Sequence, residues 1–175
     1  GAMNAVVLAH GFAQAAAQEK KPADALHLGR DLARQALREL WEGVGTMGTM
    51  GNILWGVPLP GVPIMGVLNQ FLSPYQTNPL NINPLRQLLT RVVDFDTLVH
   101  PENAAVVPKL FVCATNVRTG RGKIFTGEQV TADAIMASAC LPQMFKAVEI
   151  DGEHYWDGGF SGNPALYPLL YETKS

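Results

Sequence analysis

The sequence has few charges and few cysteines, and it lacks clusters of either. Its 175 residues carry 13 Lys and Arg against 15 Asp and Glu, which gives a net charge of −2. A surface that binds nucleic acid usually shows clustered Lys and Arg, so this balance argues against one. The two cysteines, Cys113 and Cys140, form no Cys-x-x-Cys pair and have no metal-type spacing with the four histidines. We therefore expect no nucleic-acid partner, no disulfide framework and no metal site.

The sequence also lacks a recognisable start. Residue 1 is glycine, and residues 1–10 contain no basic segment ahead of an apolar one. This is neither a signal peptide nor a natural first residue. We expect that processing or truncation has removed what came before, so no targeting signal can be read. A reducing compartment, in the cytoplasm or at the membrane periphery, agrees with the two unpaired cysteines.

Residues 43–85 lack Asp, Glu, Lys and Arg altogether. A membrane-spanning helix is not expected there, because Pro58, Pro60 and Pro63 would break it and remove backbone donors. We predict a long apolar loop with a short helix over residues 64–72. Long structured loops often form lids or binding surfaces. A cap that simply packs on the core is an equal alternative.

The rest of the chain mixes helical and strand patterns. An Ala-rich segment without proline predicts a helix over residues 2–18, and apolar spacing predicts a second over 23–42, which Gly43 would end. A third helix should start at Pro84 with Asn83 as its N-cap. A further helix with Thr131 as its cap is predicted over 131–139, and another over 164–171. Strands are predicted over 110–115, 122–125, 147–150 and 154–156, and the turn Asp151-Gly152 should join the last two. This mixture indicates a single α/β or α+β domain over residues 1–175.

A carboxylate follows the last predicted strand. Asp157 precedes Gly158 and Gly159, and two glycines let the backbone turn sharply and come close to a ligand. An ionised carboxylate can accept a proton, although it needs a partly desolvated site to deprotonate a hydroxyl. Most Asp-Gly-Gly segments are plain turns, so the motif indicates a catalytic base only in context.

Longer stretches supply that context. Residues 137–145, the run 148–159 that ends in Trp156-Asp-Gly-Gly159, and Asn163-Pro164 resemble the closing section of bacterial patatin-like phospholipases. Residues 73–85 and 114–120 do so as well, in the same order, so the resemblance covers nearly the whole chain. It implies an α/β fold, the patatin-like three-layer α/β/α sandwich, here without its N-terminal strands and oxyanion loop.

The resemblance also implies a mechanism. The nucleophile of that family is the serine of a Gly-x-Ser-x-Gly elbow, which commonly runs into Ala-Met-Asn-Ala. Residues 2–5 have that sequence, so Gly1 matches the last glycine of the elbow, and the serine would lie two residues upstream. The aspartate of the family's Asp-Gly-Gly/Ala motif maps to Asp157, the base of a Ser–Asp dyad without a catalytic histidine. Metal and organic cofactors are not implied, and residues 1–175 alone are expected to be inactive.

The implied substrate is a phospholipid or another acyl ester, with peripheral membrane contact. Met47, Met50 and Trp55 are the candidate acyl-chain surface, although such residues are as often part of the core. Two other interpretations stay open. The chain could be a non-catalytic lipid- or partner-binding module, or an acyltransferase that passes the acyl group to an alcohol.

A complete triad within the chain has the right residue types in His154, Asp157 and Ser161. However, His154 and Asp157 are an odd number of positions apart on one predicted strand, so they should point to opposite faces. Arg118 and Arg121 could meet a phospholipid head group, but a solvated turn is the simpler interpretation.

Overall fold

The computed structural model describes residues 1–19, 21–55, 84–140 and 146–161, and it describes the side chains of these ranges except at 47–55. The helices are α1 (Ala2–Gln18), α2 (Pro22–Trp55), α5 (Pro84–Val92), α6 (Phe95–Val99) and α7 (Ala132–Ser138). The strands are β1 (Val112–Asn116), β2 (Gly122–Phe125), β3 (Val148–Ile150) and β4 (Glu153–Asp157). Three 3-10 turns complete the described part: η1 (Pro101–Asn103), η2 (Gly127–Gln129) and η3 (Gly158–Phe160).

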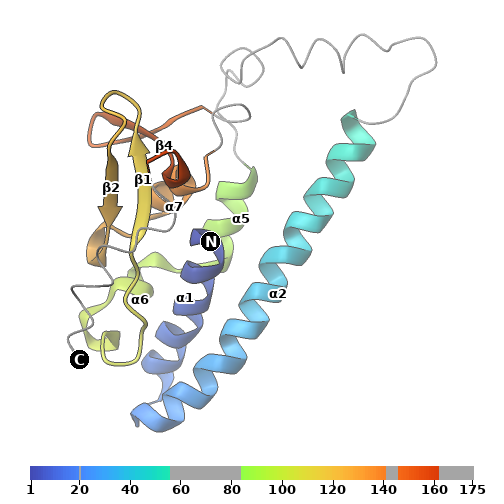
Figure 1. Cartoon of the computed structure of the whole chain (residues 1–175). Coiled ribbons are helices and arrows are strands. Elements are labelled where there is room, and N and C mark those ends of the chain that lie inside the picture. Colours follow the sequence, from blue (N-terminus) through green and yellow to red (C-terminus); the bar gives the residue numbers. More distant parts are fainter. Residues whose placement is uncertain (20, 56–83, 141–145, 162–175) are drawn as a thin grey trace.

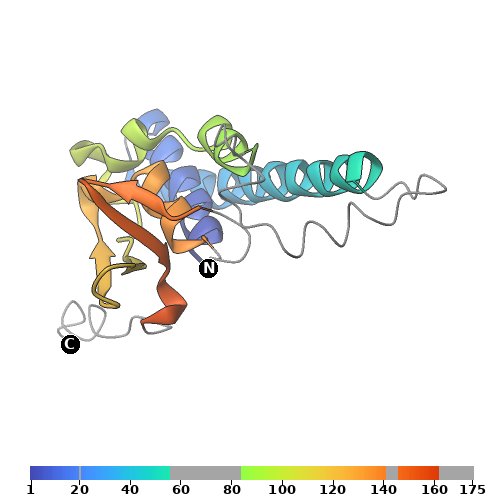
Figure 2. The same cartoon turned by 90° about the horizontal axis from the view of Figure 1, so that it is seen from above.

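The four strands form one antiparallel sheet in the order β2-β1-β4-β3. Helix α7 packs against β1, β3 and β4, and it also contacts α1 and α5. Figure 1 shows α1 between α2 and the sheet, and Figure 2 shows the helices gathered on one side of the strands. The register places Asp157 opposite Ala114 of the central strand β1.

Most of the predicted elements are confirmed. Helix α1 and strand β2 have the predicted bounds, and β1, β3 and β4 differ from the predictions by one or two residues at their ends. Thr131 caps α7 as expected, because its Oγ1 accepts the N–H of Ala134 at 3.2 Å. Helix α5 begins at Pro84. The predicted N-cap at Asn83, the helix over 64–72 and the helix over 164–171 lie outside the described residues.

The predicted end of the second helix is wrong. Helix α2 continues past Gly43 to Trp55, so residues 43–55 are not part of a loop. The reason lies in packing against α5. A Cβ at Gly43 would lie 2.7 Å from Leu88 Cδ1, so Leu88 occupies the space that the missing side chain leaves open. A glycine inside a helix costs roughly 1 kcal/mol, which tertiary packing can outweigh.

Helices α1 and α2 form a hairpin with small residues at their crossing. A Cβ on Gly11 would lie 2.4 Å from the backbone nitrogen of Ala33, and a Cβ on Gly29 would lie 2.5 Å from the ring of Phe12. The two backbones therefore approach closely, and α1 is buried between α2 and the rest of the core. In the part of the chain that the structure describes, no helix combines the length and the apolar character needed to cross a membrane.

His10 is a buried polar residue in α1, only 2% exposed. Its Nε2 accepts the backbone N–H of Asp94 at 3.1 Å, so the ring proton belongs on Nδ1. That atom has no hydrogen-bond partner among the described residues. Burial lowers the pKa of His10 below its ordinary value of 6.5, and the negative charge of Asp94 opposes this shift only in part.

We expect the free energy of unfolding to fall as the pH drops below 6.5. In that range the unfolded chain takes up a proton at His10 while the folded chain does not, so stability rises with pH. One such group gives a slope no steeper than about 1.4 kcal/mol per pH unit. Urea unfolding between pH 5 and 7 would measure it. The His10→Gln variant keeps an acceptor and should flatten the slope, whereas His27→Gln on the exposed face of α2 should not.

Candidate active site

Asp157 ends strand β4 and begins the tight turn η3. Its backbone N–H donates to the carbonyl oxygen of Cys140 at 2.9 Å. Its carboxylate oxygen Oδ1 accepts the N–H of Gly159 at 2.7 Å, so the side chain caps the turn that follows it. Among the described residues, no hydrogen bond reaches the second oxygen, Oδ2. Asp157 is half-buried, and its carboxylate is held at Oδ1 while Oδ2 has no partner among the described residues.

Gly158 packs directly on the central strand. A Cβ at this position would lie 2.4 Å from the carbonyl oxygen of Cys113 and 2.8 Å from its carbonyl carbon. Backbone atoms cannot move aside as a flexible side chain can. The glycine after Asp157 is therefore required by the close approach of the turn to β1, and not by an unusual φ angle.

A pair of hydroxyl groups anchors the same turn. Thr115 Oγ1 on β1 lies 2.8 Å from the main-chain oxygen of Asp157 and 3.0 Å from Ser161 Oγ. Ser161 Oγ in turn donates to the carbonyl oxygen of Gly158 at 3.1 Å. Thr115 is buried. These contacts hold the backbone of residues 157–161 against the sheet and so limit where the carboxylate can point.

The structure does not assemble the alternative triad. His154 is exposed, and its Nε2 lies 3.9 Å from Glu149 Oε2 on the neighbouring strand. Ser161 bonds to Thr115 and to the backbone of Gly158, as described above. The three residue types of a triad are present in His154, Asp157 and Ser161, but each side chain interacts with a different partner.

Cys140 lies beside Asp157 without being a nucleophile. The thiol is buried and donates to the carbonyl oxygen of Lys146 at 3.2 Å. Burial raises the pKa of Cys140 to about 11, and the nearby negative charge of Asp157 adds to the shift. The nucleophilic form of cysteine is the thiolate, so this side chain is a neutral thiol at physiological pH. Cys113 is also free, and it is half-buried.

The turn between β1 and β2 is held by its own contacts. Asn116 Oδ1 accepts the N–H groups of Arg118 and Thr119 at 3.0 and 2.9 Å, and Asn116 Nδ2 donates to Glu153 Oε2 at 2.9 Å. The guanidinium of Arg118 pairs with the same Glu153. Arg118 therefore joins the β1–β2 turn to the start of β4, in agreement with the simpler interpretation of this segment as a turn.

The other predicted site residues lie at the start of α1 and in the last turns of α2. Gly1 is the N-cap of α1, and its carbonyl oxygen accepts the N–H of Ala5 at 3.1 Å. Met47, Met50 and Trp55 belong to the last turns of α2, and their side chains lie outside the described ones.

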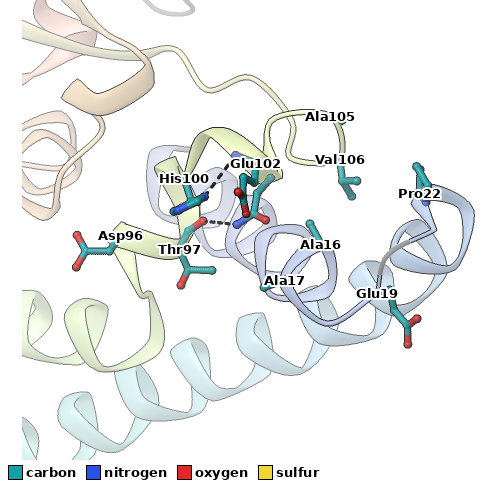
Figure 3. A pocket seen from close by; sticks show the side chains of 11 residues that line it. Ala16, Ala17, Glu19, Pro22, Asp96, Thr97, His100, Glu102, Ala105 and Val106 are labelled. Atoms are coloured by element: carbon teal, nitrogen blue, oxygen red, sulfur yellow. Dashed lines mark hydrogen bonds between the residues drawn. The ribbon is translucent and has the colours of Figure 1, made fainter.

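A pocket of about 570 Å³ lies between the end of α1, the start of α2 and the α6–η1 corner (Figure 3). Its polar groups serve local structure: His100 Nδ1 accepts the N–H of Glu102 at 3.4 Å, and Asn103 Nδ2 donates to the carbonyl oxygen of Thr97 at 2.8 Å. A second pocket, of about 320 Å³, shares His100 and is mostly apolar. Asp157 lines neither. Within the described ranges, no three His, Cys, Asp or Glu side chains group as metal ligands.

Sequence reasoning predicted Asp157 and its two glycines as site residues, but it missed the residues that hold this turn in place. Thr115, Cys113 and the carbonyl of Cys140 position the turn, yet each belongs to another element. A buried threonine inside an apolar strand is a weak signal, because its partner is known only once β1 and β4 are paired.

Comparison with protein families agrees with the resemblance. The family model described as patatin-like phospholipase matches residues 1–170. No curated protein and no solved structure matches the chain with significance. The helices and the four-stranded sheet of the described residues fit the α/β class of that family. Since the match covers nearly all of the sequence, the chain belongs to the patatin-like phospholipase family.

Proposed function

We propose that the intact protein is a lipid acyl hydrolase that works through a Ser–Asp dyad with Asp157 as its base. The family indicates a lipid hydrolase that acts on acyl esters. The observation that carries the finer proposal is the state of the Asp157 carboxylate, whose Oδ1 accepts the N–H of Gly159 while Oδ2 receives no hydrogen bond from any described residue. A proton acceptor that is fixed in place and half-buried is what general-base catalysis requires.

The proposed nucleophile is a serine outside these 175 residues. No Gly-x-Ser-x-Gly segment occurs within them, since the nearest approach, Gly159-Phe-Ser161-Gly-Asn163, has Asn where the last glycine belongs. Ser161 is in any case bonded to the turn itself. Residues 1–175 alone are therefore proposed to be inactive, because both the nucleophile and the oxyanion donors would be missing.

The chemistry proceeds in two steps. As the serine oxygen attacks the acyl carbon, its proton passes to Asp157 Oδ2, and the same proton then goes to the departing alcohol as the ester bond breaks. The result is an acyl-enzyme. A water molecule next attacks the acyl carbon and gives its proton to Asp157, which returns a proton to the serine as the fatty acid leaves. Neither step uses a metal or an organic cofactor.

Labelling of the intact protein with a fluorophosphonate tests this proposal. The reagent bonds covalently to an activated serine, and peptide mapping by mass spectrometry locates the label. We expect it on a serine two residues before Gly1. Absence of a label on folded protein, or a label on Ser161, would contradict the proposed dyad and favour the non-catalytic lipid-binding module instead.

A further inference from the structure

Helix α2 carries three exposed arginines at regular intervals. Arg30, Arg34 and Arg38 are each four residues apart, and all three are exposed. Residues four apart on an α-helix lie near one another on the same side, turned by about 40° at each step. The three guanidinium groups therefore form a gently winding row along α2, in the part of that helix that Figure 1 shows beside α1.

This row is largely free of internal ion pairs. Arg34 lies 3.8 Å from Asp31 in a pair whose two side chains are both 79% exposed, so water screens the attraction strongly. Arg30 and Arg38 make no ion pair with any residue that the structure describes. Since few of the described groups neutralise these cations, their charge is available to an outside partner.

Large apolar side chains flank the arginines. Trp41 is 52% exposed, Leu26 is 44% exposed, and Leu8 of the neighbouring α1 is 39% exposed. Trp41 Nε1 donates to Asn4 Oδ1 at 2.9 Å, which ties the ring to α1 one turn before Leu8. In the described part of the chain, the large apolar side chains that are exposed are these three and Phe160.

The order around α2 is that of a helix lying in a membrane interface. Successive residues are turned by about 100° around the helix axis. Going around the helix, a buried alanine stripe is followed by apolar residues, then by the arginines with Trp41, and last by carboxylates. The members of these four groups are, in the same order, Ala25, Ala33 and Ala36; Leu26 and Leu37; Arg30, Arg34 and Arg38; and Asp24, Asp31 and Glu42. Interfacial helices combine Lys or Arg with Trp and Leu in this way. The carboxylates border the arginine row on the side opposite Leu26 and Leu37, where Asp31 lies next to Arg34.

We infer that this face of α2, with Leu8 of α1, docks the protein on an anionic phospholipid surface. Charge complementarity selects that partner, because the row is cationic although the chain as a whole has a net charge of −2. The inference deepens the proposed lipid hydrolase by naming the surface that meets the substrate's membrane. It places the contact on the arginine row of α2 and not only on the uncharged residues that follow it.

Vesicle flotation of the intact protein tests the inference without measuring turnover. The vesicles contain phosphatidylcholine with or without phosphatidylglycerol, and all proteins carry Asp157→Asn. Binding and hydrolysis are thereby separate results, and failure of one does not decide the other. We expect binding that increases with phosphatidylglycerol and weakens as salt is added.

The chain offers a matched pair of double variants. R30Q/R38Q removes two cations from the row, and R91Q/R121Q removes two exposed arginines elsewhere, with the same change in net charge. Each arginine near an anionic surface contributes roughly fivefold to binding, so R30Q/R38Q should lose roughly 25-fold and R91Q/R121Q much less. Equal losses in the two variants would overturn the inference. Binding that does not depend on phosphatidylglycerol would also overturn it. So would a change in self-association of R30Q/R38Q, measured by sedimentation, because the face would then bind a second copy of the chain.

Discussion

The Asp157→Asn variant of the intact protein should lose about three orders of magnitude in kcat for ester hydrolysis. Asparagine keeps the oxygen that accepts the N–H of Gly159, so the turn should remain in place. What it loses is the ability to take a proton from the attacking serine. Because substrate binding does not need that proton transfer, KM should change little. Initial rates with a chromogenic ester and with phospholipid would measure both quantities.

A control with the same chemical change lies nearby. Asp151 is exposed in the β3–β4 turn at φ 53°, a conformation that asparagine accepts as readily as aspartate. Asp151→Asn therefore removes one negative charge from the same hairpin without touching the carboxylate at Asp157, and its rates should stay within twofold of wild type. If Asp157→Asn also kept rates within a few-fold of wild type, Asp157 could not be the base.

Local sequence patterns predicted those elements whose stability is itself local. Thr131 with its helix, the Asp151-Gly152 turn between β3 and β4, and the Ala-rich α1 all depend on residues close together in the chain. Their caps, turns and periodicity are visible in sequence. The position of the catalytic candidate Asp157 at a strand end was predictable for the same reason.

The full length of α2 was not predictable in this way. Gly43 indicated a helix end, because glycine is the usual residue just after one. The structure instead uses the missing side chain to admit Leu88 of α5. Such a contact joins residues 45 positions apart, and no pattern within the helix itself shows that a partner will fill the space.

The environment of the candidate base depends on pairing between distant strands. Thr115 and Cys113 reach residues 157–161 only because β1 lies beside β4 in the sheet. The sequence shows two glycines after Asp157 but does not distinguish their roles. In the structure Gly159 supplies the N–H that holds the carboxylate, and Gly158 leaves room for the carbonyl group of Cys113.

The Gly158→Ala variant should therefore lower both stability and activity. The added methyl group would lie 2.4 Å from the carbonyl oxygen of Cys113, so either β1 or the turn must shift. Overpacking of this kind typically costs about 1 to 3 kcal/mol, and we expect the upper part of that range because the neighbour is backbone. A displacement of the turn also moves the Asp157 carboxylate, and an error of about 1 Å in a catalytic group can cost roughly 100-fold in rate. Urea unfolding and ester hydrolysis would measure the two effects.

Gly45→Ala separates this steric effect from the general effect of replacing glycine. A Cβ at Gly45 would meet no atom within 4 Å, and the residue lies inside α2. Alanine should there stabilise the protein by about 0.5 to 1 kcal/mol, because it loses less backbone entropy on folding and favours the helix. Opposite signs for the two substitutions would establish that Gly158 is needed for close packing on β1. A Gly158→Ala variant as stable and as active as wild type would show that the turn does not approach Cys113 this closely, and the fixed position proposed for Asp157 would be lost with it.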